Sequence, residues 1–194
     1  DITAAIHKAA AVVIGPGLGQ EAGAERLLDL VLQEAEKLPE LPVVIDADGL
    51  NLLAKKRLYS TLGRQYVLTP HLREMSRLSG KSVQEIADDM TSAVMGQQAG
   101  ATIVLKDART LVSDGDWIYI NLSGNSALST GGSGDVLSGM IGGLLAQGCT
   151  QRTAATLAVY MHGLTAEQYC ESALPHCMLA RDILEMIPKI GGNS

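Results

Sequence analysis

Four short apolar runs, each followed by polar or helix-breaking residues and then by a helical pattern, constrain the fold more than any other feature. They occupy residues 10–14, 42–46, 66–69 and 102–106. The runs do not alternate between apolar and polar residues, which is typical of parallel strands buried on both faces. Strands that alternate with helices predict an α/β fold with a mostly parallel sheet. A hairpin is expected at 110–121, around Asp114-Gly115.

Between and after these runs, apolar residues recur at the spacing of an amphipathic helix. No internal repeat, low-complexity segment or linker interrupts the pattern, so we expect a single domain over residues 1–194, with a tail from residue 191. The predicted helices cover residues 20–37, 50–55, 72–78, 82–98, 153–171 and 177–186, and a further one runs from the glycine-rich segment near residue 133 to residue 147.

Composition and charge limit the class of protein. The chain has 194 residues, of which 46% are hydrophobic and 19% charged, which is ordinary for a soluble globular domain with its own core. The net charge of −6 without a basic block argues against a nucleic-acid partner. The sequence has neither a long apolar span nor a signal peptide, and its three cysteines lack metal-type spacing. We therefore expect reduced thiols, a cytoplasmic location and no membrane partner.

The segment from Asn125 to Met140 carries the strongest functional signal. Its run of small residues ends at Asp135 and opens directly onto an apolar helical pattern. Glycine lets the backbone approach a ligand closely, and a helix start offers unpaired N–H groups and a positive dipole end to an anion. A carboxylate in the first turn stays ionised. Donors for a phosphate beside a single base predict phosphoryl transfer.

A simpler interpretation of the same segment stays open. Ser133 or Asp135 could serve only as the N-cap of the helix, and the glycines could mark an ordinary turn. Two other motifs are absent. Gln20 breaks the dinucleotide-binding pattern that Gly15, Gly17 and Gly19 begin, and Gly80-Lys81-Ser82 has Met75 where a Walker P-loop needs its first glycine, so neither a hydride-transfer Rossmann domain nor a Walker P-loop is favoured.

Polar residues also follow the other predicted strands, at the sheet edge where ligands bind in parallel α/β folds. Lys106 at a strand end suits a phosphate. His71 is interpreted as a ligand contact or a turn residue, and Asp46 and Asp48 as helix caps or site lining. His162 is expected in the core or on the surface. The candidate lining residues at this edge are Gly15, Gly17, Gly19, Asp46, Asp48, Asn51, His71, Lys106 and Asp107.

Taken together, five segments resemble the NAD(P)H-hydrate dehydratase family. They read VVIGPGLG, VIDADGLN, LTPHLREM, VLKDART and STGGSGDVLSG, and they occur in the family's order over nearly all of the chain. The resemblance implies a ribokinase-like fold with helices on both faces of a mostly parallel sheet. It also implies that the family domain is longer at its amino end, by roughly one βα unit.

The chemistry implied by the resemblance is nucleotide-dependent repair. A hydroxyl added to the nicotinamide ring of NADH or NADPH is phosphorylated by ADP or ATP, and phosphate then leaves to restore the ring. The resemblance implies that Asp135 is the base and that the N–H groups from Gly132 to Asp135 form the anion hole. Mg²⁺ is expected with the nucleotide, and no side chain is assigned as a metal ligand. By the same resemblance, the expected hydrate contacts are Gly17, His71 and Asp135, and the expected nucleotide contacts are Lys106, Asp107, Ala108, Arg109, Thr110, Gly132, Ser133 and Gly134.

The resemblance also bears on partners. Family members often form tetramers and in many bacteria follow an epimerase domain, so a homo-tetramer and an epimerase domain or partner are expected. Two other functions stay open. A small-molecule kinase of the same fold, acting on a hydroxymethylpyrimidine, a hydroxyethylthiazole or a sugar, would share the Gly-x-Gly-Asp loop. A nucleotide-binding module without turnover would share it as well.

Overall fold

The computed structural model describes residues 1–95 and 100–190, so the predicted tail and the end of the predicted helix over 82–98 lie outside the described residues. The strands of these ranges form one sheet in the order β1-β2-β3-β4-β5-β6, parallel from β1 to β4 and antiparallel from β4 to β6. The predicted strands and hairpin are confirmed as β1 (Val12–Ile14), β2 (Val43–Ile45), β3 (Tyr66–Leu68), β4 (Thr102–Leu105), β5 (Leu111–Ser113) and β6 (Ile118–Ile120).

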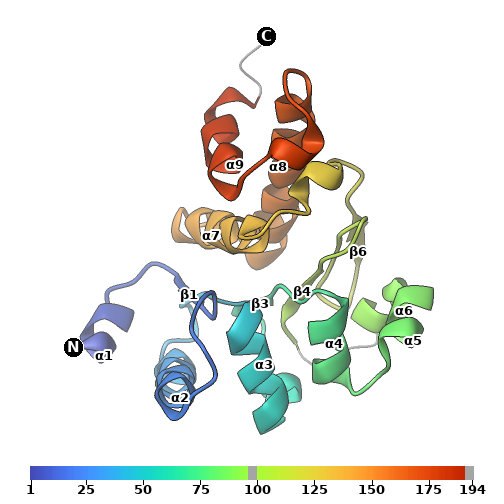
Figure 1. Ribbon diagram of the computed structural model, residues 1–194. Coiled ribbons are helices and arrows are strands. Elements are labelled where there is room, and N and C mark those ends of the chain that lie inside the picture. The colour runs from blue at the N-terminus through green and yellow to red at the C-terminus, as the bar shows by residue number, and fades with distance from the viewer. Residues whose placement is uncertain (96–99, 191–194) are drawn as a thin grey trace.

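Helices cover both faces of this sheet, as predicted (Figure 1). Successive residues of a strand point to opposite faces, so Val43 and Ile45 pack on one side and Val44 on the other. The first face carries α1 (Ile2–Ile6), α2 (Ala22–Lys37), α3 (Ala47–Lys56), α4 (Leu72–Ser79), α5 (Val83–Asp88) and α6 (Met90–Met95). The second carries α7 (Ser133–Ala146) and α8 (Gln151–Cys170), with α9 (Ala180–Met186) packed on them.

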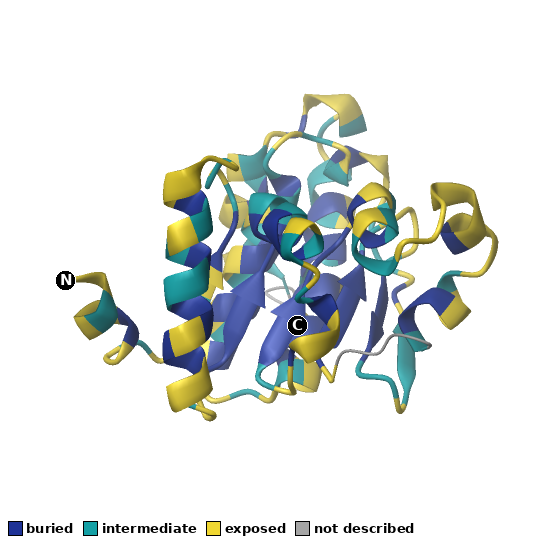
Figure 2. Cartoon of the chain, turned by 90° about the horizontal axis from the view of Figure 1, so that it is seen from below, coloured by how far each residue is buried: buried dark blue, intermediate teal, exposed yellow. Residues whose placement is uncertain are grey.

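The core is aliphatic, and the burial of the strands follows their place in the sheet. β2, β3 and β4 are buried along their whole length, as predicted, with the helices turning exposed residues outward (Figure 2). β1 is different, because Val13 is 41% exposed. The prediction that this strand is buried on both faces was wrong for the second face. β1 is the edge of the sheet, so it has a neighbouring strand on one side only.

Two helix predictions also need correction. Over the described part of 82–98 the chain forms two short helices, because the backbone of Asp89 is not helical (φ −143°, ψ 75°) and its carboxylate accepts hydrogen bonds from the Ser92 N–H and hydroxyl. A side chain that bonds forward in this way ends one helix and begins the next. The helix expected over 50–55 begins earlier, at Ala47, because Asp46 caps α3 directly. No helix in the described ranges has the length and apolar character needed to cross a membrane.

Candidate active site

An open cavity of about 660 Å³ lies where β3 and β4 end and α7 begins. Its wall joins segments that are far apart in the sequence, which supports the prediction of a site at the carboxyl edge of the strands. Seven of the predicted site residues line it: His71, Lys106, Asp107, Ala108, Thr110, Ser133 and Gly134. Arg109, Gly132 and Asp135 are chain neighbours of these residues but do not line the cavity themselves.

The start of α7 has no side-chain cap. Gly132 is the N-cap, with a left-handed backbone at φ 86°, so the capping interpretation of Ser133 and Asp135 was wrong. Ser133 is the first residue of the helix, and Asp135 is exposed in its first turn. Within the described chain, the N–H groups of Gly134 and Asp135 have no acceptor. These two donors and the positive end of the helix dipole are therefore free to bind an anion.

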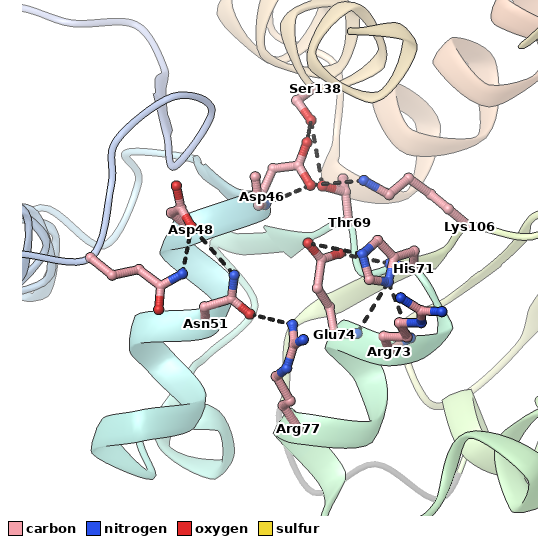
Figure 3. A network of polar contacts seen from close by, with 12 residues as sticks. Asp46, Asp48, Asn51, Thr69, His71, Arg73, Glu74, Arg77, Lys106 and Ser138 are labelled. Carbon is pink, nitrogen blue, oxygen red and sulfur yellow. Dashed lines mark hydrogen bonds and ion pairs between the residues drawn. The ribbon is translucent and has the colours of Figure 1, made fainter. Parts of the chain in front are cut away.

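Lys106 places a positive charge beside these donors. It follows β4, and its side-chain nitrogen donates to Asp46 Oδ1 at 2.8 Å (Figure 3). The ammonium also lies against the first turn of α7, because a Cβ built on Gly134 would be 3.2 Å from it. The sequence prediction that Lys106 faces a phosphate site fits this position. Asp46 does not line the cavity: it is 1% exposed and caps α3 through the Ala47 N–H.

His162, which lies on α8, also contacts the start of α7. Its Nε2 lies 3.1 Å from the Ser133 carbonyl oxygen and 3.2 Å from the Ser133 hydroxyl. Burial lowers the pKa of His162 to about 4, so the ring is neutral at pH 7. Of the two positions left open for it, core or surface, His162 has the buried one, and it also lines the cavity. A histidine within an apolar helix carries no signal that could have shown this contact in advance.

The first glycine-rich loop lies beside the cavity rather than in its wall. Its three glycines have positive φ, which only glycine adopts without strain: 123° at Gly15, 63° at Gly17 and 77° at Gly19. Asp48 accepts from the Gly19 N–H at 3.0 Å and from the Gln20 amide at 2.8 Å. Asn51 donates to Asp48 at 3.4 Å. Asp48 and Asn51 therefore support the loop and do not line the cavity.

His71 is a helix cap on the cavity wall, and its role as a ligand contact stays a prediction. It caps α4, because its Nδ1 accepts from the N–H groups of Arg73 at 3.1 Å and Glu74 at 3.2 Å. A nitrogen that accepts two hydrogen bonds is unprotonated, so the proton of the neutral ring is assigned to Nε2. The ring also lines the cavity. This tautomer leaves an N–H donor that a ligand could share with Glu74, whose carboxylate lies 3.5 Å away.

The remaining wall comes from the segment before α7, of which only the last part was singled out in the sequence. Asn121 organises it: its amide donates to the Ser123 carbonyl oxygen at 2.9 Å and accepts from the Ser123 hydroxyl at 3.0 Å. The segment then packs directly on α8, where a Cβ on Gly163 would lie 2.1 Å from Ser123 Oγ. The lining residues that the sequence prediction did not name as contacts are Asn121, Ser123, Gly124, Val159 and His162, together with Asn125, Ser126, Leu128, Ser129, Thr130 and Leu137 of the segment it did single out.

Metal ligands are scarce at this site. Over residues 1–95 and 100–190, no group of three or more His, Cys, Asp or Glu side chains is arranged to hold a metal ion. Among the described residues that line the cavity, Asp107 is the one with a carboxylate. A Mg²⁺ ion in proteins is commonly held by one or two carboxylates together with substrate phosphates, and this wall fits that kind of binding.

A protein-family model described as NAD(P)H-hydrate dehydratase matches residues 2–189. The chain belongs to this family. Among curated relatives, the ADP-dependent (S)-NAD(P)H-hydrate dehydratase of Neisseria meningitidis is 44% identical over 167 residues, which cover 83% of this chain and 55% of that protein. The bifunctional NAD(P)H-hydrate repair enzyme of Coxiella burnetii is 38% identical over 186 residues, which cover 94% of this chain and 36% of that enzyme. The chain thus spans about a third to a half of the length of these relatives.

A solved structure agrees with the assignment to the family. The ADP/ATP-dependent NAD(P)H-hydrate dehydratase of Bacillus subtilis, co-crystallised with ATP and Mg²⁺, superposes with a TM-score of 0.76 at 31% identity. The match covers 93% of this chain and 63% of the Bacillus chain. The sheet order and this likeness confirm the α/β, ribokinase-like fold.

Proposed function

We propose that the protein containing this chain converts hydrated NAD(P)H to NAD(P)H with ADP or ATP as the phosphoryl donor. The observation that carries the proposal is the uncapped start of α7. There, two free N–H groups and the Lys106 ammonium lie at an open cavity, and the exposed Asp135 is in the same helix turn, in a chain of this family. An anion site beside a base suits the transfer of a phosphoryl group to a hydroxyl.

In this mechanism Asp135 takes the proton from the hydroxyl on the hydrated ring, and the oxygen attacks the terminal phosphorus of the nucleotide. The bond from that phosphorus to the bridging oxygen breaks, and the shortened nucleotide leaves. The N–H groups of Gly134 and Asp135 and the Lys106 ammonium stabilise the charge on the transferred group. Phosphate then departs with the C–O electron pair, and a proton lost from the neighbouring ring carbon restores the double bond.

The proposed contacts follow the layout of the cavity. Nucleotide phosphates would lie at the start of α7, and the remainder of the nucleotide along the wall from Lys106 to Thr110. The hydrate would lie on the other side of Asp135, toward His71 and Gly17. Asp107 would hold Mg²⁺ together with the nucleotide phosphates. When bound, the ion neutralises phosphate charge.

The test is recovery of the near-ultraviolet absorbance of the reduced nicotinamide from purified hydrate. It uses the full-length protein with ADP, with ATP or with neither nucleotide. We expect recovery only when one nucleotide is present. No recovery with either nucleotide would refute the proposal. A stable phosphorylated product from an alcohol panel, with the hydrate untouched, would indicate the kinase. Nucleotide binding without any turnover would indicate the binding module.

Assembly and partners form a separate part of the proposal. Leu157, Tyr160 and Leu184 on α8 and α9 have exposed apolar side chains that a second copy could cover. We propose a homo-tetramer, and light scattering that returns a monomer at micromolar concentration would contradict it. An epimerase domain or partner is proposed because the Coxiella relative is bifunctional. A single domain over residues 1–194 and a cytoplasmic location also stay predictions, to be tested by limited proteolysis and by cell fractionation.

A further inference from the structure

We propose that Asp46 is a positioning residue for phosphoryl transfer, and that its buried carboxylate holds the Lys106 ammonium against the positive end of α7. The proposal rests on the proposed function in one respect, because the anion bound at α7 is taken to be a nucleotide phosphate. Asp46 follows β2 and Lys106 follows β4, with β3 between these strands in the sheet. The two residues are 60 positions apart in the sequence.

Both carboxylate oxygens of Asp46 are engaged. Oδ1 accepts from Lys106 at 2.8 Å and from the Ala47 N–H at 2.8 Å. Oδ2 accepts from the Ser138 hydroxyl at 2.5 Å. With 1% of its surface exposed, Asp46 has no access to a substrate proton. It therefore cannot act as the base, and its effect on the reaction has to pass through the groups that it holds (Figure 3).

The electrostatics of α7 explain why Lys106 needs such a partner. The start of a helix carries a partial positive charge, so an ammonium group beside it is repelled. Lys106 is nevertheless close enough to the first turn for a Cβ on Gly134 to lie 3.2 Å from its nitrogen. An adjacent carboxylate offsets this repulsion and fixes a long, flexible side chain in one place. Ser138 lies on α7 itself, so its bond to Asp46 also ties the helix to the end of β2.

This arrangement prepares the site for an anion before the anion arrives. An ammonium group has three N–H donors, and Asp46 takes one of them. The others are left for a phosphate, next to the free N–H groups of Gly134 and Asp135. Donors that are already in place need no rearrangement when charge develops in the transition state. Without Asp46, the Lys106 side chain would move away from the helix start and toward water.

The test compares ADP affinity by calorimetry in Asp46→Asn, Lys106→Met and the double variant of the full-length protein. Asparagine keeps the shape of the side chain and removes its charge. We expect each single variant to bind ADP about tenfold more weakly, as for the loss of one hydrogen bond to a charged group. The double variant should be no weaker than Lys106→Met, because Asp46 acts through Lys106. Asp29→Asn is the matched control, since Asp29 forms an ion pair of 2.9 Å with Lys56 outside the site.

Two other patterns of ADP affinity can be told apart from the expected one. If Asp46 contributed only negative charge near the phosphates, Asp46→Asn would bind ADP more tightly than the wild type. If it only stabilised the fold, its effect and that of Lys106→Met would multiply in the double variant. Either result overturns the proposal.

A third variant keeps the test decisive if Asp46→Asn does not fold. Ser138→Ala keeps both charges, should weaken ADP binding severalfold, and should lose that effect in the Lys106→Met background. Ser138→Ala with wild-type affinity would then overturn the proposal. Because ADP binding is measured without the hydrate, a wild type that binds ADP but repairs no hydrate would refute the proposed function while leaving this test intact.

Discussion

Asp135→Asn separates a catalytic base from a helix residue in one variant. Asp135 is exposed in the first turn of α7, and no hydrogen bond from its side chain is found in the described part of the chain. Its contribution to stability is therefore limited to the attraction between a carboxylate and the helix dipole, about 0.3–1 kcal/mol. For a chain of this length, that corresponds to a fall in Tm of at most about 4 °C.

The effect on turnover should be far larger than the effect on stability. Asparagine cannot take a proton from the hydroxyl, and the loss of a positioned base costs about 10²–10⁴ in rate. ADP should still bind, because the N–H groups that receive the phosphate belong to the backbone and stay in place. The expected result is a nearly normal Tm, nearly normal ADP affinity and a loss of turnover of at least two orders of magnitude.

The assay measures single-turnover hydrate repair, ADP binding and thermal unfolding on the same preparation. Asp182→Asn is the matched control, because Asp182 is also a first-turn carboxylate, on α9, and accepts from the Leu179 N–H at 2.8 Å. This control should lose at least as much stability and keep its turnover. If Asp135→Asn kept near-normal turnover, the base would have to be another residue, whatever the family's motif implies.

The remaining predictions concern the support of the cavity. Gly163→Ala places a Cβ 2.7 Å from the Ser123 backbone carbon, so the fold should lose about 1–3 kcal/mol and ADP should bind more weakly. Gly143→Ala, on an open part of α7, should stabilise the fold by up to about 1 kcal/mol; urea unfolding that ranks the two variants equally would contradict this account. Because burial lowers the pKa of His162 to about 4, the neutral ring stabilises the fold fully above its unfolded pKa near 6.5, and this contribution decreases as pH falls toward 4. From about pH 7 to pH 5 the wild type should therefore lose about 2 kcal/mol more unfolding free energy than His162→Gln does. If both proteins lost the same amount, this role of His162 would be refuted.

Local patterns in the sequence were enough to predict most of the elements. The strands and the long helices depend on runs of apolar residues at fixed spacing, and a buried strand or an amphipathic helix needs that spacing wherever it lies in the sheet. The glycines of the first loop and of the start of α7 were predictable for a similar reason. A position with a left-handed backbone favours glycine whatever the tertiary contacts around it. The break at Asp89 was not predicted, because the apolar helical spacing continues across this residue. That spacing does not reveal the side-chain hydrogen bonds to Ser92 that end one helix and begin the next.

The sequence by itself thus determined the α/β order of elements, the glycine-rich loops and the glycine-rich start of α7. Only the tertiary structure decided what surrounds that helix start. In the folded chain the Lys106 ammonium donates to Asp46 at 2.8 Å, and His162 contacts Ser133. Asp48, with Asn51 bonded to it, holds the first glycine-rich loop. These contacts join segments that are tens of residues apart, and their partners carry no local pattern. Their positions depend on how the strands are ordered in the sheet and on which helices cover each face.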